Sequence, residues 1–262
     1  MNEDVKLANK KEDNSKLKGF ILMMAVCLIA GFIGGFVVAG AGDMDIFKDM
    51  AAVISGAIKF ISMYANFVLT IISVIAVFIL CRQSRKLFAK WDGEDEAVSK
   101  AFEKKLSIAM IIVSIDTILL FVFMAIGIIR LVELKAMGKS TFTTVSIFIY
   151  FMGIVGTLLF TVIAQQKIIN LTKEMNPEKK GSIFDTKFQK KWFESCDEME
   201  KQQIFEASYA SYKAVNTTCM ALLIILLVGA EVVDIGVMPI CIVGIIWIVS
   251  MLSYFIKCLK FE

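Results

Sequence analysis

The chain has 262 residues, of which 58% are hydrophobic and 20% are charged, and its formal net charge is +3. The apolar residues form long runs and the charges form a few blocks, which excludes a soluble globular domain, because such a domain spreads its charges over its surface. Histidine is absent, which excludes histidine-dependent general base catalysis and histidine metal sites, and with them a serine–histidine or metal-dependent membrane protease.

Six apolar stretches predict an all-α integral membrane protein. A bilayer core of about 30 Å requires about 20 apolar residues in a helix. A charged tail (1–18) precedes the first stretch, and we expect 19–262 to form a single membrane domain with charged loops at 82–105 and 165–213. The predicted spans are 19–41, 58–81, 106–129, 143–164, 214–233 and 238–256.

The first span carries small residues at every fourth position, which places them on one helix face. Small side chains allow helix backbones to approach closely in lipid. This stripe predicts packing either against another span of the same chain or against a second copy in a homodimer. Its apolar run is longer than the about 7–15 residues of a signal peptide, so we expect a retained anchor. The stripe consists of Cys27, Gly31, Gly35 and Ala39.

Basic residues are distributed unequally between the two sides of the predicted membrane. Of the 28 lysines and arginines, 23 fall in the N-terminal tail, the loops 82–105 and 165–213 with their borders, and the C-terminal tail, and five fall on the other side. The positive-inside rule then places both termini in the cytoplasm. The basic loops are expected to meet anionic lipids at the inner face, rather than nucleic acid, because they flank spans and contain acids as well.

Spans two to five are expected to continue as helices into the cytoplasm. A turn at Asp92-Gly93 ends the second, with Asp92 as the cap of the next helix, and Asn176-Pro177 breaks the fourth. Lys90-Trp91 and Lys191-Trp192 are each followed by an acidic pair. This weak similarity leaves two alternatives open, a parallel repeat of spans two and three in spans four and five, or a chance match.

The segments KWDGEDE and NPEKKGSIFDTKFQKKWFESCDEMEKQ, with the charged N-terminal tail, resemble a six-span family of Gram-positive bacteria known as domain of unknown function 3169. The resemblance runs along nearly the whole chain and is most specific in the long fourth loop. It implies a multi-pass protein of the bacterial cytoplasmic membrane. It implies no activity and no functional residue.

No catalytic or cofactor signature is present, so we expect neither an enzyme nor a bound cofactor or metal. The chain has no glycine-rich phosphate loop and no Cys-x-x-Cys pair among its six cysteines. The acidic cluster after Trp91 lacks the alternation of a calcium-binding EF-hand loop and is typical of a solvated helix start. Polar residues inside the spans are therefore the remaining candidates for a functional site.

Asp116 stands alone in the apolar run IVSIDTILL of the third span. At 1.5 Å per residue it lies about 16 Å from the inner boundary, near the midplane, and Ser73, Thr70 and Thr157 lie at about 13–18 Å. No lysine or arginine reaches this depth, so we expect a neutral Asp116 that hydrogen-bonds these hydroxyls. A proton- or cation-handling role and an ionised Asp116 in a water-filled vestibule are the alternatives.

Two functions fit these observations. The first is a non-enzymatic accessory, sensory or immunity-type component whose cytoplasmic face docks a membrane or soluble protein partner. The second is a small proton-linked transporter or channel that uses Asp116, Ser73 and Thr70. The large charged cytoplasmic face and the absence of catalytic signatures favour the first.

Overall fold

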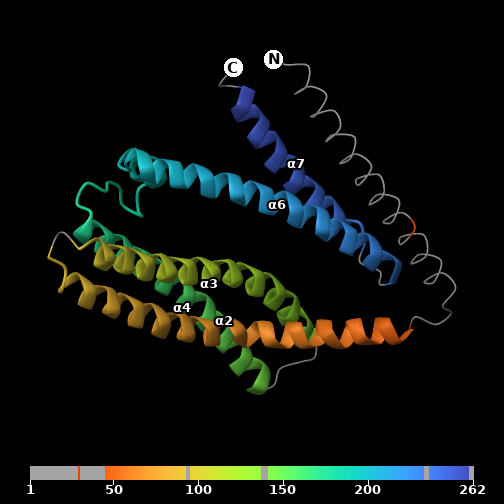
Figure 1. Cartoon of the computed structure of the whole chain (residues 1–262). Helices are drawn as coiled ribbons and strands as arrows, with labels where there is room; N and C mark the ends of the chain where they lie inside the picture. Colours follow the sequence, from red (N-terminus) through yellow and green to blue (C-terminus); the bar gives the residue numbers. More distant parts are fainter. Residues whose placement is uncertain (1–28, 30–44, 93–94, 137–140, 233–235, 260–262) are drawn as a thin grey trace, which may run out of the picture. The chain divides into compact units, whose positions relative to one another are not determined.

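The computed structural model describes residues 29, 45–92, 95–136, 141–232 and 236–259 (Figure 1). Five of its helices, all except the short α5, are long and apolar enough to cross a membrane. The predicted all-α class is confirmed for the described residues, and the six-span count stays a prediction because the span 19–41 lies outside them apart from Ile29. The helices are α2 (Asp45–Phe88), α3 (Glu96–Ala136), α4 (Thr141–Met175), α5 (Phe188–Glu194), α6 (Glu198–Val232) and α7 (Met238–Leu259).

The first three long helices exceed the thickness of a bilayer core. They contain 44, 41 and 35 residues, which correspond to about 66, 62 and 53 Å at 1.5 Å per residue. A hydrocarbon core is about 30 Å thick. Each helix therefore extends well beyond its apolar run, α2 past 81 to Phe88 and α4 past 164 to Met175.

The start of α3 is fixed by an aspartate cap. The Asp95 Oδ1 atom accepts hydrogen bonds from the backbone N–H groups of Ala97 at 2.9 Å and Val98 at 3.3 Å, which satisfies donors that have no partner within the helix. Asp92 instead accepts a bond from the Asp95 N–H at 3.0 Å. The predicted cap at Asp92 is therefore wrong, because the helix begins at Glu96 and Asp95 precedes it.

The chain divides into two compact units, and each is described by itself. The larger unit, residues 53–206, contains most of α2, all of α3, α4 and α5, and the start of α6. Its buried apolar side chains form two groups. We call the end of this unit with the connections 89–95 and 176–187 the loop end, and the opposite end the far end. The loop-end core consists of Val77, Cys81, Phe102, Leu106, Ala109, Val113, Ala164, Ile168, Leu171 and Met175, and the far-end core of Met63, Leu134 and Tyr150.

The outer surface of this unit is apolar. Ile118, Phe148 and Ile163 expose 63–65% of their area. A soluble protein rarely leaves so many large apolar side chains open to water. Together with the helix lengths, this surface indicates insertion into a membrane.

The smaller described unit contains α7 and α6 from Ala207 onward. The Tyr212 and Tyr254 rings stack with centroids 4.4 Å apart and an interplanar angle of 11°. The Tyr212 hydroxyl also lies 2.9 Å from the Met251 sulfur. These contacts hold the two helices of this unit against each other.

Candidate functional site

A polar layer lies between the loop-end core and the far-end core. Thr70 of α2 places its hydroxyl 2.5 Å from the Thr157 hydroxyl of α4 and donates to the Asp116 carboxyl of α3 at 3.5 Å. Ser73, one turn from Thr70, also hydrogen-bonds this carboxyl group. All four side chains expose 8% or less of their area. The structure therefore brings together the four polar residues named from the sequence.

Three further polar residues border this layer. The Thr161 and Thr117 hydroxyls lie 3.0 Å apart, and Asn66 is 97% buried, with an amide nitrogen that has no hydrogen-bond partner in the described part of the chain. Residues four apart share one face of a helix. Asn66 and Thr161 stand four residues from Thr70 and Thr157, so helical spacing is the signal that finds them.

Two basic side chains at the far end, Lys59 and Arg130, form ion pairs with another acid, Glu133. Lys59 pairs with Glu133 at 2.7 Å, and Arg130 pairs with the same carboxylate at 2.9 Å. Among the described lysines and arginines, none forms an ion pair with Asp116. The hydroxyl groups of Thr70 and Ser73 are therefore its direct polar neighbours.

The loop-end core closes the bundle on one side of Asp116. Ala109 and Val113 are fully buried, and Val77 and Ala164 are 4% exposed. These side chains belong to α2, α3 and α4 and fill the space between the polar layer and the loop end. An ion or proton that moves between Asp116 and the loop end would require the three helices to separate.

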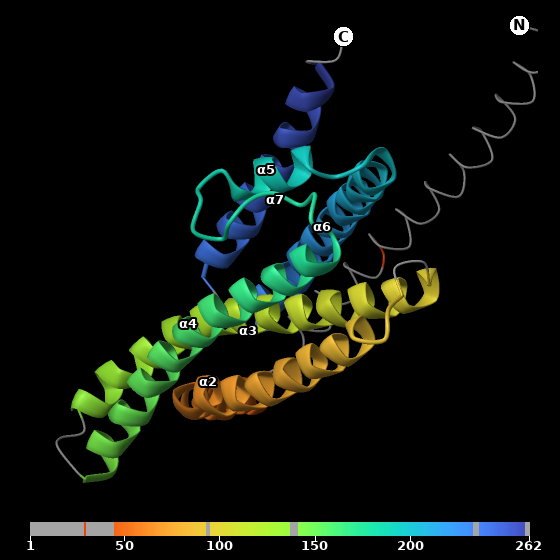
Figure 2. The ribbon, with the colours of Figure 1, turned by 90° about the vertical axis from the view of Figure 1, so that its left-hand side faces the viewer.

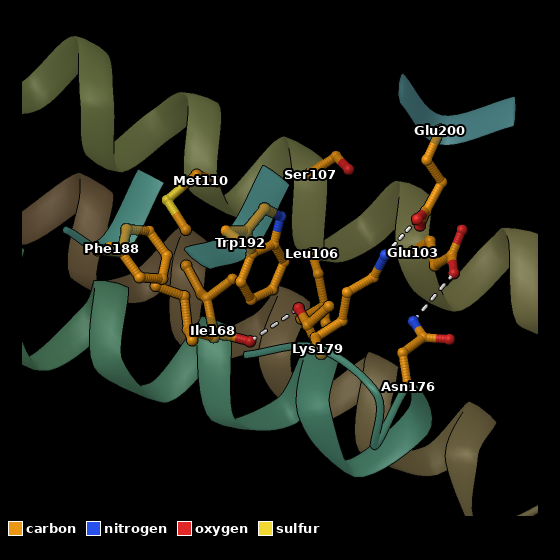
Figure 3. A pocket seen from close by; sticks show the side chains of 12 residues that line it. Glu103, Leu106, Ser107, Met110, Ile168, Asn176, Lys179, Phe188, Trp192 and Glu200 are labelled. Atoms are coloured by element: carbon orange, nitrogen blue, oxygen red, sulfur yellow. Dashed lines mark hydrogen bonds and ion pairs between the residues drawn. The ribbon is translucent and has the colours of Figure 1, made fainter. Parts of the chain in front are cut away.

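A pocket of about 440 Å³ opens at the loop end (Figure 3). α3 and α4 form its walls, and the segment 176–200, which includes α5, lines the rest of it (Figure 3). We call this segment the cover of the pocket. Figure 2 shows α5 in the connection between α4 and α6. The lining residues are Glu103, Leu106, Ser107, Met110, Ile168, Ile169, Thr172, Asn176, Lys179, Phe188, Trp192 and Glu200.

The pocket has an apolar half and a charged half. Figure 3 shows Met110, Phe188 and Ile168 at one side and Glu103 and Glu200 at the other, with Trp192 between them. The Phe188 and Trp192 rings lie 5.6 Å apart and are one helical turn from each other in α5. This division matches an amphipathic molecule better than a uniformly polar one.

Lys179 fixes the cover of the pocket by an ion pair with Glu200. The Lys179 side chain is 4% exposed. Burial by itself lowers the pKa of this ammonium group, but the hydrogen bond and charge of Glu200 outweigh it and raise the pKa above its ordinary value. Lys179 is therefore charged at neutral pH, and its charge is compensated inside the fold.

Glu200 also caps α6. Its carboxylate accepts a bond from the Asp197 N–H at 3.0 Å, and the Asp197 carboxylate accepts one from the Glu200 N–H at 2.7 Å. This reciprocal arrangement is a capping box, with Asp in place of the usual Ser or Thr. One carboxylate thus ties the start of α6 to the cover of the pocket.

The rest of the cover is fixed by short-range bonds. Gly181 adopts a φ of +116°, which favours glycine, and its carbonyl accepts a bond from Lys173. Lys191 pairs with Asp185, and this bond, with one from the Lys187 N–H, lowers the pKa of the Asp185 carboxyl. The segment is therefore an ordered structure and not an open loop.

The pocket does not follow from the sequence pattern. The break at Asn176-Pro177 and the pair Lys191-Trp192 are visible in the sequence, but nothing in the pattern brings Lys179 next to Glu200. A buried lysine in a charged segment gives no periodic signal, since the burial depends on the turn at Gly181. The predicted packing stripe Cys27, Gly31, Gly35 and Ala39 lies outside the described residues.

A protein-family model matches most of the chain. The model of a family described as a protein of unknown function (DUF3169) matches residues 18–258. No similar protein is found among curated proteins or among solved structures. Since the match covers nearly the whole chain, including both segments on which the resemblance was based, this chain belongs to the DUF3169 family.

Proposed function

We propose that this chain is a non-enzymatic component of the cytoplasmic membrane of a Gram-positive bacterium, with six spans and both termini inside. It works as an accessory, sensory or immunity-type protein through its cytoplasmic face. The observation that carries this proposal is the folded cover of the loop-end pocket. This connection is fixed by a buried ion pair and carries aromatic side chains. Such a surface is suited to the recognition of a binding partner.

The charge distribution supports a cytoplasmic location for the loop end. The loop end carries most of the basic residues, which favour the cytoplasmic side of a membrane. The pocket walls at Leu106 and Ile168 lie close to the predicted inner boundary of the spans. Recognition would therefore take place at the level of the inner headgroups, within reach of a soluble or membrane partner.

Complementation in a strain without this gene tests the proposal. We expect that Phe188→Ala with Trp192→Ala fails to restore the deletion phenotype, while Glu194→Gln, an exposed change outside the pocket lining, restores it. We also expect the unchanged protein to co-purify with a second component in mild detergent. Full complementation by the pocket variant, with a lone monomer in detergent, would remove the proposal.

A second candidate is a small proton-linked transporter or channel. The observation that favours it is the polar layer, in which Asp116 lies buried among hydroxyls of α2 and α4. Buried acids near a membrane midplane often belong to proton or ion paths. The packed loop-end core argues against a path that is permanently open to protons or ions.

Proton movement in reconstituted vesicles separates the two candidates. A transporter that uses Asp116 would lose proton flux in the Asp116→Asn variant and keep it in Glu194→Gln. Equal flux in Asp116→Asn and the unchanged protein would remove Asp116 from any mechanism.

A further inference from the structure

We propose that the loop-end pocket binds an amphipathic amine, that is, an ammonium group attached to an aromatic or hydrocarbon chain. This inference rests on the proposed recognition role of the cytoplasmic face and names the ligand class of that site. It follows from three features of the lining: an uncompensated carboxylate, two aromatic rings and an apolar wall.

The charged half of the pocket carries a net negative charge. Its lining contains two carboxylates, Glu103 and Glu200, and one ammonium group, Lys179. Lys179 forms an ion pair with Glu200. Glu103 accepts a bond from the neutral Asn176 amide at 3.3 Å, and no lysine or arginine in the described ranges forms an ion pair with it. The remaining charge attracts a cation and repels an anion.

The aromatic rings favour the same class of ligand. Trp192 lies between the apolar half and the charged half, and Phe188 lies on its apolar side (Figure 3). The face of an indole ring attracts ammonium groups more strongly than other aromatic faces do. A carboxylate and an indole in one pocket together select an amine over a neutral polar group.

The apolar wall accommodates the rest of the ligand. Leu106, Met110 and Ile168 face the pocket from α3 and α4, at the predicted level of the membrane boundary. Hydrocarbon that leaves water here gains about 25 cal/mol per Å² of buried area. A chain or ring attached to the amine therefore adds affinity.

Charge-matched probes test the proposal directly. The full-length protein in phosphatidylglycerol nanodiscs is titrated with 4-phenylbutylamine, 4-phenyl-1-butanol and 4-phenylbutyrate by calorimetry, with empty nanodiscs subtracted. We expect the amine to bind most tightly and the carboxylate not to bind. Glu103→Gln is expected to weaken the affinity for the amine by about tenfold, which corresponds to the loss of one charged hydrogen bond. Glu96→Gln, an exposed change on the same helix outside the pocket, should leave the affinity unchanged.

A second titration distinguishes two sources of the amine. Phosphatidylethanolamine is mixed into the nanodiscs, and the apparent affinity for 4-phenylbutylamine is measured again. A weaker affinity indicates that a lipid headgroup amine occupies the site, and an unchanged affinity indicates a soluble amine. Either result supports the ligand class.

The proposal is overturned if no probe binds, if the alcohol or carboxylate binds as tightly as the amine, or if Glu103→Gln has no effect. Its failure differs from failure of the proposed function. If Phe188→Ala with Trp192→Ala still abolishes complementation while the amine does not bind, recognition at this face stands and only the ligand class is wrong.

Discussion

The Asp116 carboxyl group lies among hydroxyls from neighbouring helices, and its surroundings contain no ion-pair partner from the described residues. A buried carboxylate without a counter-ion is costly, so we expect the neutral acid at this site. In that form it connects α2 to α3, while Thr70 continues the connection to Thr157 of α4. We therefore propose that Asp116 serves to pack the three helices together, rather than to take part in catalysis or transport.

A pair of substitutions at Asp116 tests this view. Asp116→Asn keeps an acceptor for Thr70, so we expect the free energy of unfolding to stay within about 0.5 kcal/mol. Asp116→Leu leaves two hydroxyls without their acceptor and should cost about 0.5–2 kcal/mol. Unfolding in mixed micelles, followed by circular dichroism, measures both. Thr217→Val, at an exposed position of α6, is the control, and equal losses in both Asp116 variants would mean that the charge itself stabilises the fold.

Cys196 provides a chemical probe of the pocket cover. Its thiol is buried, and burial raises its pKa above the ordinary value, against the opposing effect of Lys179. Because the thiolate is the reactive form, N-ethylmaleimide at pH 7.5 should modify the exposed Cys258 before Cys196. The rate at Cys196 should rise as the pH exceeds 9. Mass spectrometry of peptides follows both sites, and equal rates at pH 7.5 would contradict an ordered cover.

At the scale of helices, α2 and α4 approach closely at one glycine. A Cβ atom added at Gly153 would lie 3.0 Å from the Phe67 backbone nitrogen and 3.3 Å from the Asn66 Cβ atom, whereas one at Gly156 would meet nothing within 4 Å. The two positions share a helix, and only the one at Gly153 lies against α2 in this way. Small residues at such crossings let helices pack in lipid.

Alanine substitution at the two glycines separates packing from helix propensity. Gly153→Ala should lower the free energy of unfolding by about 1–3 kcal/mol, because the backbone of α2 cannot yield cheaply. Gly156→Ala should change it by about 0.5 kcal/mol or less. Unfolding in mixed micelles is again the measurement. Similar values for the two variants would show that α2 and α4 do not pack at Gly153.

The ion pair at the pocket can be removed without removing the helix cap. Glu200→Gln keeps the capping box, which accepts glutamine, but leaves the buried Lys179 charge without its partner. We expect this to destabilise the cover by about 1–3 kcal/mol. Hydrogen exchange of residues 177–195 should then speed up. Glu194→Gln, in an exposed pair with Lys190 at 3.8 Å, should not change it, and identical exchange in both variants would contradict the role of the pair.

At the scale of the whole molecule, the membrane class and the positions of the five long helices that the structure describes followed from the sequence, because apolar run length is a strong signal in lipid. Similar depths in the bilayer also grouped Asp116 with Thr70, Ser73 and Thr157. The pocket did not follow from the sequence. It depends on the turn at Gly181 and on the ion pair between Lys179 and Glu200. The cap of α3 was predicted at Asp92 but lies at Asp95, because several acids near the turn can serve as the cap.

Orientation is the property of the whole molecule on which both proposals depend. Since 23 of the 28 basic residues gather on the predicted inner side, we expect the C-terminus and the loop end to face the cytoplasm. Alkaline phosphatase requires disulfides and is active only outside the cytoplasm. Fused after Glu262 it should be inactive, and fused after Lys139, in the predicted outer link between α3 and α4, it should be active.

Green fluorescent protein at the same two positions gives the reciprocal readout, with fluorescence expected after Glu262 and not after Lys139. Comparable membrane levels of the fusions, measured by immunoblot, exclude a loss of expression as the cause. The reverse pattern would place the loop-end pocket outside the cell. Its amine ligand would then come from the outer leaflet or the medium, and a cytoplasmic partner would be ruled out.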